Sequence, residues 1–180
     1  MTMRRCALLL RAVNVSGRNR VPMAELRTLL AERTALERIT TYIASGNVIA
    51  DVTGDPAATA EQVRGLIREA FDVDTPVIVR SHDALERALA ENPFPDVQVD
   101  SALHVMFLAG EPAPGATDAL RTRLRPGERI ALIGHDLWID YGDGGVAGTK
   151  LTRAVLDRAL GVAGTARNLL TLRRLVELTA

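Results

Sequence analysis

The sequence predicts an α+β fold in which a ferredoxin-like βαββαβ half, residues 1–80, packs intimately on a second, smaller α/β half, residues 81–180, with C-terminal helices. Two observations lead to this prediction. Up to residue 80, β-rich runs and helix-periodic runs alternate as strand, helix, strand, strand, helix, strand, with a hairpin signal at the centre. After residue 80, most of the same order returns.

Turn and capping residues separate the elements of the first half. The apolar start predicts a strand, Pro22 suits the first turn of a helix, and Ser45-Gly46-Asn47 divides two β-rich runs as a hairpin turn. Asp55 or Thr53 is suited to cap the second helix. The expected elements are strand 6–13, helix 22–33, strands 39–44 and 48–52, helix 56–71 and strand 75–80.

The second half has a less regular order. Ser81 is suited to cap its first helix, and the glycine-rich segment 142–148 predicts a flexible connection to a helix that begins at Thr149 or Lys150. The final run has helical spacing, so after its first helix this half reads β-α-β-β-α-α, with a helix where a last strand would complete the pattern of the first half. The expected elements are helix 82–91, strand 103–108, helix 116–124, strands 130–133 and 137–141, and helices 150–160 and 165–178.

Composition narrows the classes of function. The 180 residues include 22 basic and 22 acidic ones, so no global charge draws the chain to nucleic acid or to an anionic membrane. The single cysteine, Cys6, excludes an intrachain disulfide, and the three histidines lack metal-ligand spacing, so we expect no metal and no cofactor. Arg11 interrupts the apolar start too early for a signal peptide, and no run is long enough to span a membrane. These features predict a soluble, cytoplasmic protein.

Seven short motifs occur in order along the chain: LRAVNV (10–15), VPMAEL (21–26), TYIASGNV (41–48), ENPF (91–94), LHV (103–105), TKLT (149–152) and TARN (165–168). Together they resemble a bacterial family of uncharacterised proteins, domain of unknown function 1697 (DUF1697), over essentially the whole chain. The resemblance implies a two-part α+β fold with a ferredoxin-like first half, and it implies no activity. The sequence departs from the family at Ala12, where glycine is usual, and at Leu169, where tryptophan is usual. The second change removes an aromatic ring that could stack on a ligand.

Unusual polar residues stand at the ends of the predicted elements, where loops carry function more often than cores do. They close the first strand, form the tip of the first hairpin, and open the last two helices. The candidate ligand-binding residues are Arg11, Asn14, Ser45, Asn47, Lys150, Thr152, Arg167 and Asn168.

Two of these candidates are cations that we expect in the first turn of a helix. A lysine or arginine there is unfavourable beside the positive end of the helix dipole, unless an anion offsets it. We therefore predict a small phosphate- or carboxylate-bearing ligand at the junction of the two halves. Lys150 would act as a point charge, Arg167 as a bidentate clamp, and the amides of Asn47 and Asn168 would orient the ligand. The sequence Gly148-Thr149-Lys150 misses the spacing of a phosphate-binding loop by one residue.

Three other interpretations stay open at the level of sequence. The same polar groups could tie the halves together, with asparagines satisfying turn backbones and arginines pairing with carboxylates. An RNA-binding module on the ferredoxin-like sheet is a second alternative, although nucleic acid is not expected from a neutral chain with six scattered aromatic residues. A self-associating structural protein without a ligand, monomer or homodimer, is the third. No acid–base pair identifies catalytic residues, so the sequence leaves open whether the protein is an enzyme.

Overall fold

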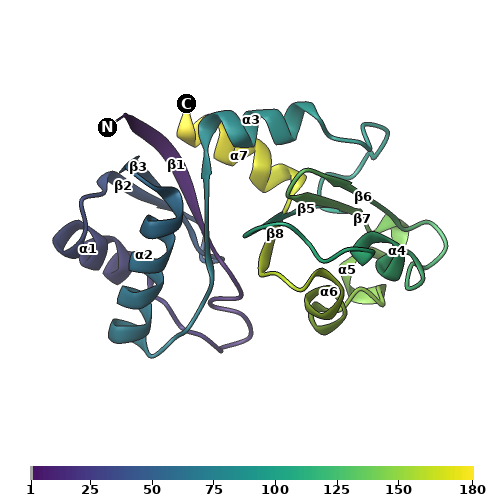
Figure 1. The fold of residues 1–180 in the computed structure, drawn as a ribbon, viewed down its shortest axis with the longest axis horizontal. Helices are drawn as coiled ribbons and strands as arrows, with labels where there is room; N and C mark the ends of the chain where they lie inside the picture. Colours follow the sequence, from purple (N-terminus) through teal and green to yellow (C-terminus); the bar gives the residue numbers. More distant parts are fainter. Residues whose placement is uncertain (1) are drawn as a thin grey trace. The chain divides into compact units, whose positions relative to one another are not determined.

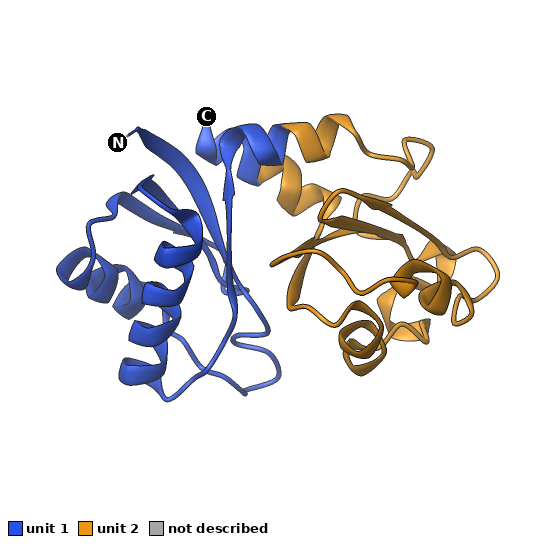
Figure 2. Ribbon diagram, in the orientation of Figure 1, with its two compact units in different colours: residues 1–86, 175–180 blue, residues 87–174 orange. Residues whose placement is uncertain are grey.

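The computed structural model describes residues 2–180, which form two compact units. Unit 1 comprises the chain up to Glu86 together with Leu175–Ala180, and unit 2 comprises Arg87–Arg174 (Figure 2). No helix within residues 2–180 is long and apolar enough to cross a membrane.

Unit 1 is a four-stranded antiparallel sheet with two helices on one face (Figure 1). The sheet order is β2-β3-β1-β4, which is the ferredoxin-like order, so the predicted fold of the first half is confirmed. Its first strand covers Met3–Leu10, three residues earlier than the expected 6–13. Its elements are β1 (Met3–Leu10), α1 (Met23–Arg33), β2 (Glu37–Tyr42), β3 (Asn47–Thr53), α2 (Pro56–Phe71) and β4 (Val77–Ser81), followed by α3 (His82–Ala90).

The central strand β1 explains why the sequence opens with an unbroken apolar run. Alternate residues of a strand point to opposite faces, and Cys6, Leu8 and Leu10 pack in the core beneath α1 and α2. Ala7 and Leu9 point to the other face and are also fully buried. Because both faces are covered, the strand shows no apolar–polar alternation.

Unit 2 contains β5 (Leu103–Leu108), α4 (Ala116–Arg121), β6 (Arg129–Ile133), β7 (Asp136–Asp140), a 3-10 turn η1 (Gly142–Gly144), α5 (Gly145–Gly148), α6 (Arg153–Leu160), β8 (Gly164–Asn168) and α7 (Leu169–Thr179). Its sheet order is β6-β7-β5-β8, which is the same topology as in unit 1. The glycine-rich segment that we predicted as a flexible connection instead forms η1 and α5.

The predicted helix at 165–178 is wrong at its beginning. Residues Gly164–Asn168 form the edge strand β8, which pairs with β5, so a last strand completes the pattern of the first half. Gly164 lies close to β5, where a Cβ atom would come within 2.8 Å of a Leu108 methyl carbon. The helical spacing of the leucines is real, but it begins at Leu169, the first residue of α7.

The registers of the two sheets correspond strand for strand. Asp51 is the fifth residue of β3 and lies opposite Arg5 of β1, while Asp140 is the fifth residue of β7 and lies opposite Leu103 of β5. One residue further along these central strands, Cys6 pairs with Ser81 and His104 pairs with Asn168.

The paired residues Ser81 and Asn168 also have the same role. The Ser81 hydroxyl accepts a hydrogen bond from the Ala84 amide at 3.3 Å, and the Asn168 side chain accepts one from the Thr171 amide at 2.9 Å. Each residue therefore caps the helix that follows its strand. The two units are two versions of one βαββαβ repeat, each followed by a capped helix.

Gly46 in the β2–β3 turn provides a test of this packing. It has φ +90°, and a Cβ atom there would lie 2.7 Å from Leu10 Cβ, whereas Gly17 has φ +75° and open space around it. We expect Gly46→Ala to lower the free energy of unfolding by about 3 kcal/mol, from backbone strain plus overpacking. The matched variant Gly17→Ala carries the strain alone and should cost about 1 kcal/mol. Equal losses in urea denaturation would contradict the close approach.

Candidate functional site

Four of the predicted ligand-binding residues lie in unit 1, at the end of its sheet where β1 stops and the β2–β3 turn begins. Arg11 directly follows β1, and its backbone is held by Thr75, whose hydroxyl accepts from the Arg11 amide at 3.1 Å and donates to the Arg11 carbonyl at 2.6 Å. The backbone of β1 also reaches the turn, because the Leu10 amide donates to the Gly46 carbonyl at 2.8 Å.

Asn14 joins three segments of the chain. Its amide nitrogen donates to the carbonyls of Val21 at 2.9 Å and Ala44 at 2.7 Å, and its amide oxygen accepts from the Val21 backbone at 2.9 Å. The motifs 10–15, 21–26 and 41–48 therefore meet at this one side chain. With three hydrogen bonds to backbone, Asn14 has a structural role in the site: it holds the loop after β1 against the β2–β3 hairpin.

Asn47 has a comparable structural role. It is fully buried as the first residue of β3, and its amide nitrogen donates to the Tyr42 carbonyl at 2.9 Å and to the Ser45 hydroxyl at 3.3 Å. These bonds close the hairpin turn across its base. Asparagine and serine in this turn satisfy backbone and each other, as turn residues commonly do.

Left-handed backbone conformations concentrate in the same place. The residues other than glycine with φ near +50° include Ala12, Asn14, Ser16, Asn19 and Ile43. A β-branched residue in this conformation is a genuine outlier, and such strain clusters at functional sites. The position of Ala12 also explains why glycine is usual there in the family that the sequence resembles, since glycine adopts φ > 0 without cost.

A cavity of about 590 Å³ opens at this end of unit 1. Its lining consists of residues from the loop after β1, the beginning of α1 and the end of β2 with its turn: Asn14, Arg20, Val21, Pro22, Met23, Thr41, Ile43 and Ala44.

The cavity reaches the N-terminus of α1. No side chain caps this helix, because its N-cap residue is Pro22, so the amides of the first turn keep their partial positive charge. Arg20 lies exposed on the cavity wall, and Arg27 on the second turn donates to the Thr41 hydroxyl at 2.6 Å.

Sequence reasoning missed Arg20, Arg27 and Thr41. A signal was present: the segments 10–24 and 38–50 carry arginines and no carboxylate. Only folding shows that these two segments, separated by α1, line one cavity. Arg20 is the one charged residue among the described residues of the lining, and it gives the cavity a positive charge.

The other four predicted residues lie in unit 2, where two of the expected placements are wrong. Lys150 does not stand in the first turn of a helix, because Thr152 is the N-cap of α6 and accepts from the Val155 amide at 3.3 Å. The helix therefore begins at Arg153, and Lys150 lies exposed in the loop before it. The argument that an anion must offset a cation in this helix turn does not apply to Lys150.

Arg167 is likewise not at a helix start. It lies in β8 opposite Val105, is buried, and donates through one Nη to the Thr165 hydroxyl at 2.8 Å and the Ala166 carbonyl at 2.9 Å. Burial lowers the pKa of Arg167 to about 10, so the side chain is still charged at neutral pH. Asn168, by contrast, does open the last helix as its cap. The role of these residues in ligand binding stays a prediction.

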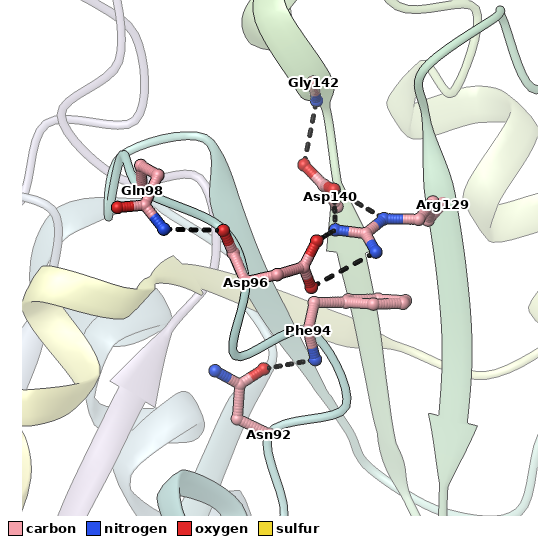
Figure 3. Close-up of polar contacts among 7 residues, drawn as sticks. All are labelled: Asn92, Phe94, Asp96, Gln98, Arg129, Asp140 and Gly142. Atoms are coloured by element: carbon pink, nitrogen blue, oxygen red, sulfur yellow. Dashed lines mark hydrogen bonds and ion pairs between the residues drawn. The ribbon is translucent and has the colours of Figure 1, made fainter.

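A second polar cluster in unit 2 was not predicted (Figure 3). Arg129 at the start of β6 donates from Nε to the buried Asp140 at 2.9 Å, and its two Nη atoms face Asp96 at 3.3 and 2.9 Å. The guanidinium carbon lies 4.5 Å from the centre of the Phe94 ring. The motif ENPF thus contributes the aromatic surface under this arginine.

Comparison with known proteins establishes the family. Residues 3–138 match the family described as "Protein of unknown function (DUF1697)". The chain belongs to this family. A solved structure titled "The structure of conserved bacterial protein SP0830 from Streptococcus pneumoniae" matches with a TM-score of 0.79 and 21% identity, over 99% of this chain and 100% of that one. At that identity the likeness supports the α+β fold alone, and none of the curated proteins matches.

The hydrogen bonds of Asn14 lead to a stability prediction. Asn14→Asp removes two donors and places a carboxylate against two carbonyl oxygens, so we expect a loss of about 2–3 kcal/mol in the free energy of unfolding. Asn19, in the same loop and also at positive φ, makes one side-chain bond to the Ala12 carbonyl at 3.0 Å. Asn19→Asp should cost about 1 kcal/mol. Similar losses for both variants in denaturant titrations would show that Asn14 does not join the three segments.

His104 leads to a prediction about pH. Its Nδ1 is buried with no hydrogen-bond partner in the described chain, and its ring meets Tyr141 edge-on at 5.1 Å. Burial lowers the pKa of His104 below its usual value, so the unfolded chain binds the proton more readily. The stability from neutral His104 is complete above about pH 6.5 and is lost as the pH falls.

We expect His104→Phe to reduce the decline in unfolding free energy between pH 7.5 and pH 5.5, because it keeps an aromatic ring and removes the titrating group. The control His135→Gln, at an exposed turn, should leave the wild-type decline in place. If the two variants follow the same pH profile in urea denaturation, His104 does not titrate as its burial requires.

Proposed function

We propose that unit 1 binds a small phosphate- or carboxylate-bearing ligand in the cavity at the beginning of α1. The observation that carries the proposal is that the uncapped N-terminus of an 11-residue helix opens into a cavity with Arg20 on its wall. Backbone amides at a helix N-terminus bind anions through hydrogen bonds and through the helix dipole. An arginine beside them adds a charge-assisted contact.

The charges around the cavity support an anion over other ligands. The one carboxylate in the first turn of α1, Glu25, is exposed and is not part of the lining. Asn14 is occupied by backbone, so it shapes the wall, while Arg20 remains exposed to a ligand. Arg27 donates to the hydroxyl of Thr41, one of the lining residues, so a second arginine contacts the wall of the cavity.

Unit 2 provides an internal comparison. At the corresponding place in its repeat, after β5 and at the start of α4, a cavity of about 470 Å³ is lined by Glu111, Asp118 and Arg121. The topology therefore produces a cavity at this place in both units, whereas the charge differs. Because the positive charge in unit 1 is not a consequence of the topology, it indicates a ligand of opposite charge.

RNA binding on the sheet of unit 1 has less support. RNA-binding modules of this topology stack bases on aromatic side chains of the strands. Here, the face opposite α1 and α2 carries the aliphatic side chains of Ala7, Leu9, Ile49 and Ile78, all of which are buried. Stacking on this face would need aromatic residues that those positions lack.

The proposal is tested by titrating the full chain with inorganic phosphate, and separately with acetate, while recording backbone amide signals by NMR. We expect saturable shifts at Met23 and Ala24. Arg20→Gln should weaken binding about tenfold, because a charge-assisted hydrogen bond contributes about 1.5 kcal/mol. Arg18→Gln is the matched control, an exposed arginine two residues earlier that is outside the lining.

Absence of saturable shifts with both anions, or an equal effect of the two arginine variants, would contradict the proposal. The first result would leave self-association without a ligand as the better interpretation. The comparison of phosphate with acetate identifies which anionic group the helix terminus prefers.

A further inference from the structure

Arg129 in unit 2 is oriented by two groups that cannot easily move. The side chain of Asp140 is only 7% exposed. Its Oδ2 accepts from Arg129 Nε at 2.9 Å and lies 2.8 Å from Nη2 of the same arginine, and its Oδ1 accepts from the Gly142 amide at 2.9 Å. Phe94 is buried and lies flat under the guanidinium (Figure 3). An arginine whose Nε and one face are fixed in this way presents its two Nη atoms in one direction.

The Nη atoms meet the carboxylate of Asp96, in the bidentate arrangement that arginine makes with carboxylates. In contrast to Asp140, the Asp96 side chain is 66% exposed, and it belongs to a segment between α3 and β5 that has no regular secondary structure. Exposed ion pairs are weak because water solvates both partners well. The buried Asp140 therefore holds Arg129 more firmly than the exposed Asp96 does.

A cavity of about 480 Å³ lies beside this arginine. Arg129 and Asp140 line it, together with Asp143, Gln98, Ser101 and the apolar side chain of Val99, whereas Asp96 does not. Arg129 therefore forms part of the cavity wall. The volume suits a small molecule, and the wall offers polar and apolar contacts for the rest of it.

We propose that Arg129 anchors a carboxylate-binding site in unit 2, and that Asp96 is an internal occupant that the carboxylate of a ligand displaces. When a ligand carboxylate replaces that of Asp96, the net charge beside the Arg129 guanidinium does not change. The site therefore already accommodates a carboxylate. Asp140 and Asp143 on the same wall repel a further negative charge. The ligand is therefore a monocarboxylate whose remaining part is neutral or cationic. This site is separate from the proposed anion site in unit 1.

The displacement can be measured with acetate as the probe. In Asp96→Ala, the fork loses its occupant, and the Nε–H signal of Arg129 should shift with acetate in a saturable way. If the wild-type pair is closed in about nine molecules of ten, the apparent dissociation constant for the wild type is about tenfold higher. Asp96→Asn, which keeps the size of the side chain without its charge, replaces Asp96→Ala if that variant does not fold.

Two controls test whether acetate binding is specific to Arg129 or occurs at any exposed arginine–carboxylate pair. Arg64 and Asp74 form a matched exposed bidentate pair with distances of 2.6 and 3.1 Å, in a part of unit 1 that lines none of the cavities described above. Asp74→Ala should give no saturable shift at Arg64. Adding Arg129→Lys to Asp96→Ala should abolish binding, because lysine keeps the charge and lacks the fork. The Gly142 amide, which donates to Asp140, reports on acetate in both variants.

Three results would overturn the proposal. These are no saturable shift in either Asp96 variant, an equal response of Arg64 in Asp74→Ala, or equal acetate affinity in the wild type and Asp96→Ala. The last result would remove the role of Asp96 as an occupant.

Discussion

The two central strands, β1 and β5, are apolar on both faces, and this constraint determines where polar chemistry can occur in the protein. From Ala7 to Leu10 and from Val105 to Leu108, every side chain is buried. Along β1 and β5, polar groups are therefore confined to the ends, and the remaining polar groups lie on the neighbouring strands, the helices and the loops. The cavity after Leu10 and the cluster around Arg129 both agree with this restriction, since the first lies where β1 stops and the second lies beside Leu103, where β5 begins.

The polar groups that do enter the sheets are stabilised by arginine. Asp51 in β3 accepts from Arg38 Nη2 at 2.9 Å and from Arg5 at 3.2 Å, and these arginines, Arg38 above all, lower its pKa. Asp140 in the corresponding position of β7 depends on Arg129. A buried carboxylate needs such partners because desolvation of an unpaired charge is costly. The planar guanidinium of arginine can pair with a carboxylate through two hydrogen bonds, which suits it to this role. The composition agrees, since Lys150 is the only lysine in the sequence.

The sequence was sufficient for elements that depend on local signals. The helix at Pro56–Phe71 has its cap at Asp55 and proline in its first turn, and the hairpin at Ser45–Asn47 has its turn residues, so both were predicted correctly. The strand β8 was not, because its five residues, GTARN, have no alternation of their own, and pairing with the distant β5 makes them a strand. The expected placement of Arg167 at a helix start failed for the same reason. The lining of the cavity in unit 1 also depends on non-local contacts, through Asn14, that spacing does not reveal.

Because the two units share topology, register and helix caps, the places where they differ carry more information about function than the places where they agree. Function belongs to sites placed on a fold. Because the fold occurs twice here, features common to both units belong to the fold, and features of one unit are candidates for function. The first difference is the cavity beside the first helix, which has Arg20 in unit 1 and Glu111 in unit 2. The second is the partner of the buried aspartate, where Leu103 in β5 stands in the place of Arg5 in β1. Among the described residues, Asp140 is paired with Arg129 and with no second arginine, and the two Nη atoms of Arg129 also meet the exposed Asp96. With Leu103 in place of an arginine, the buried carboxylate of unit 2 is paired with one arginine, whereas the corresponding carboxylate of unit 1 is shared by two.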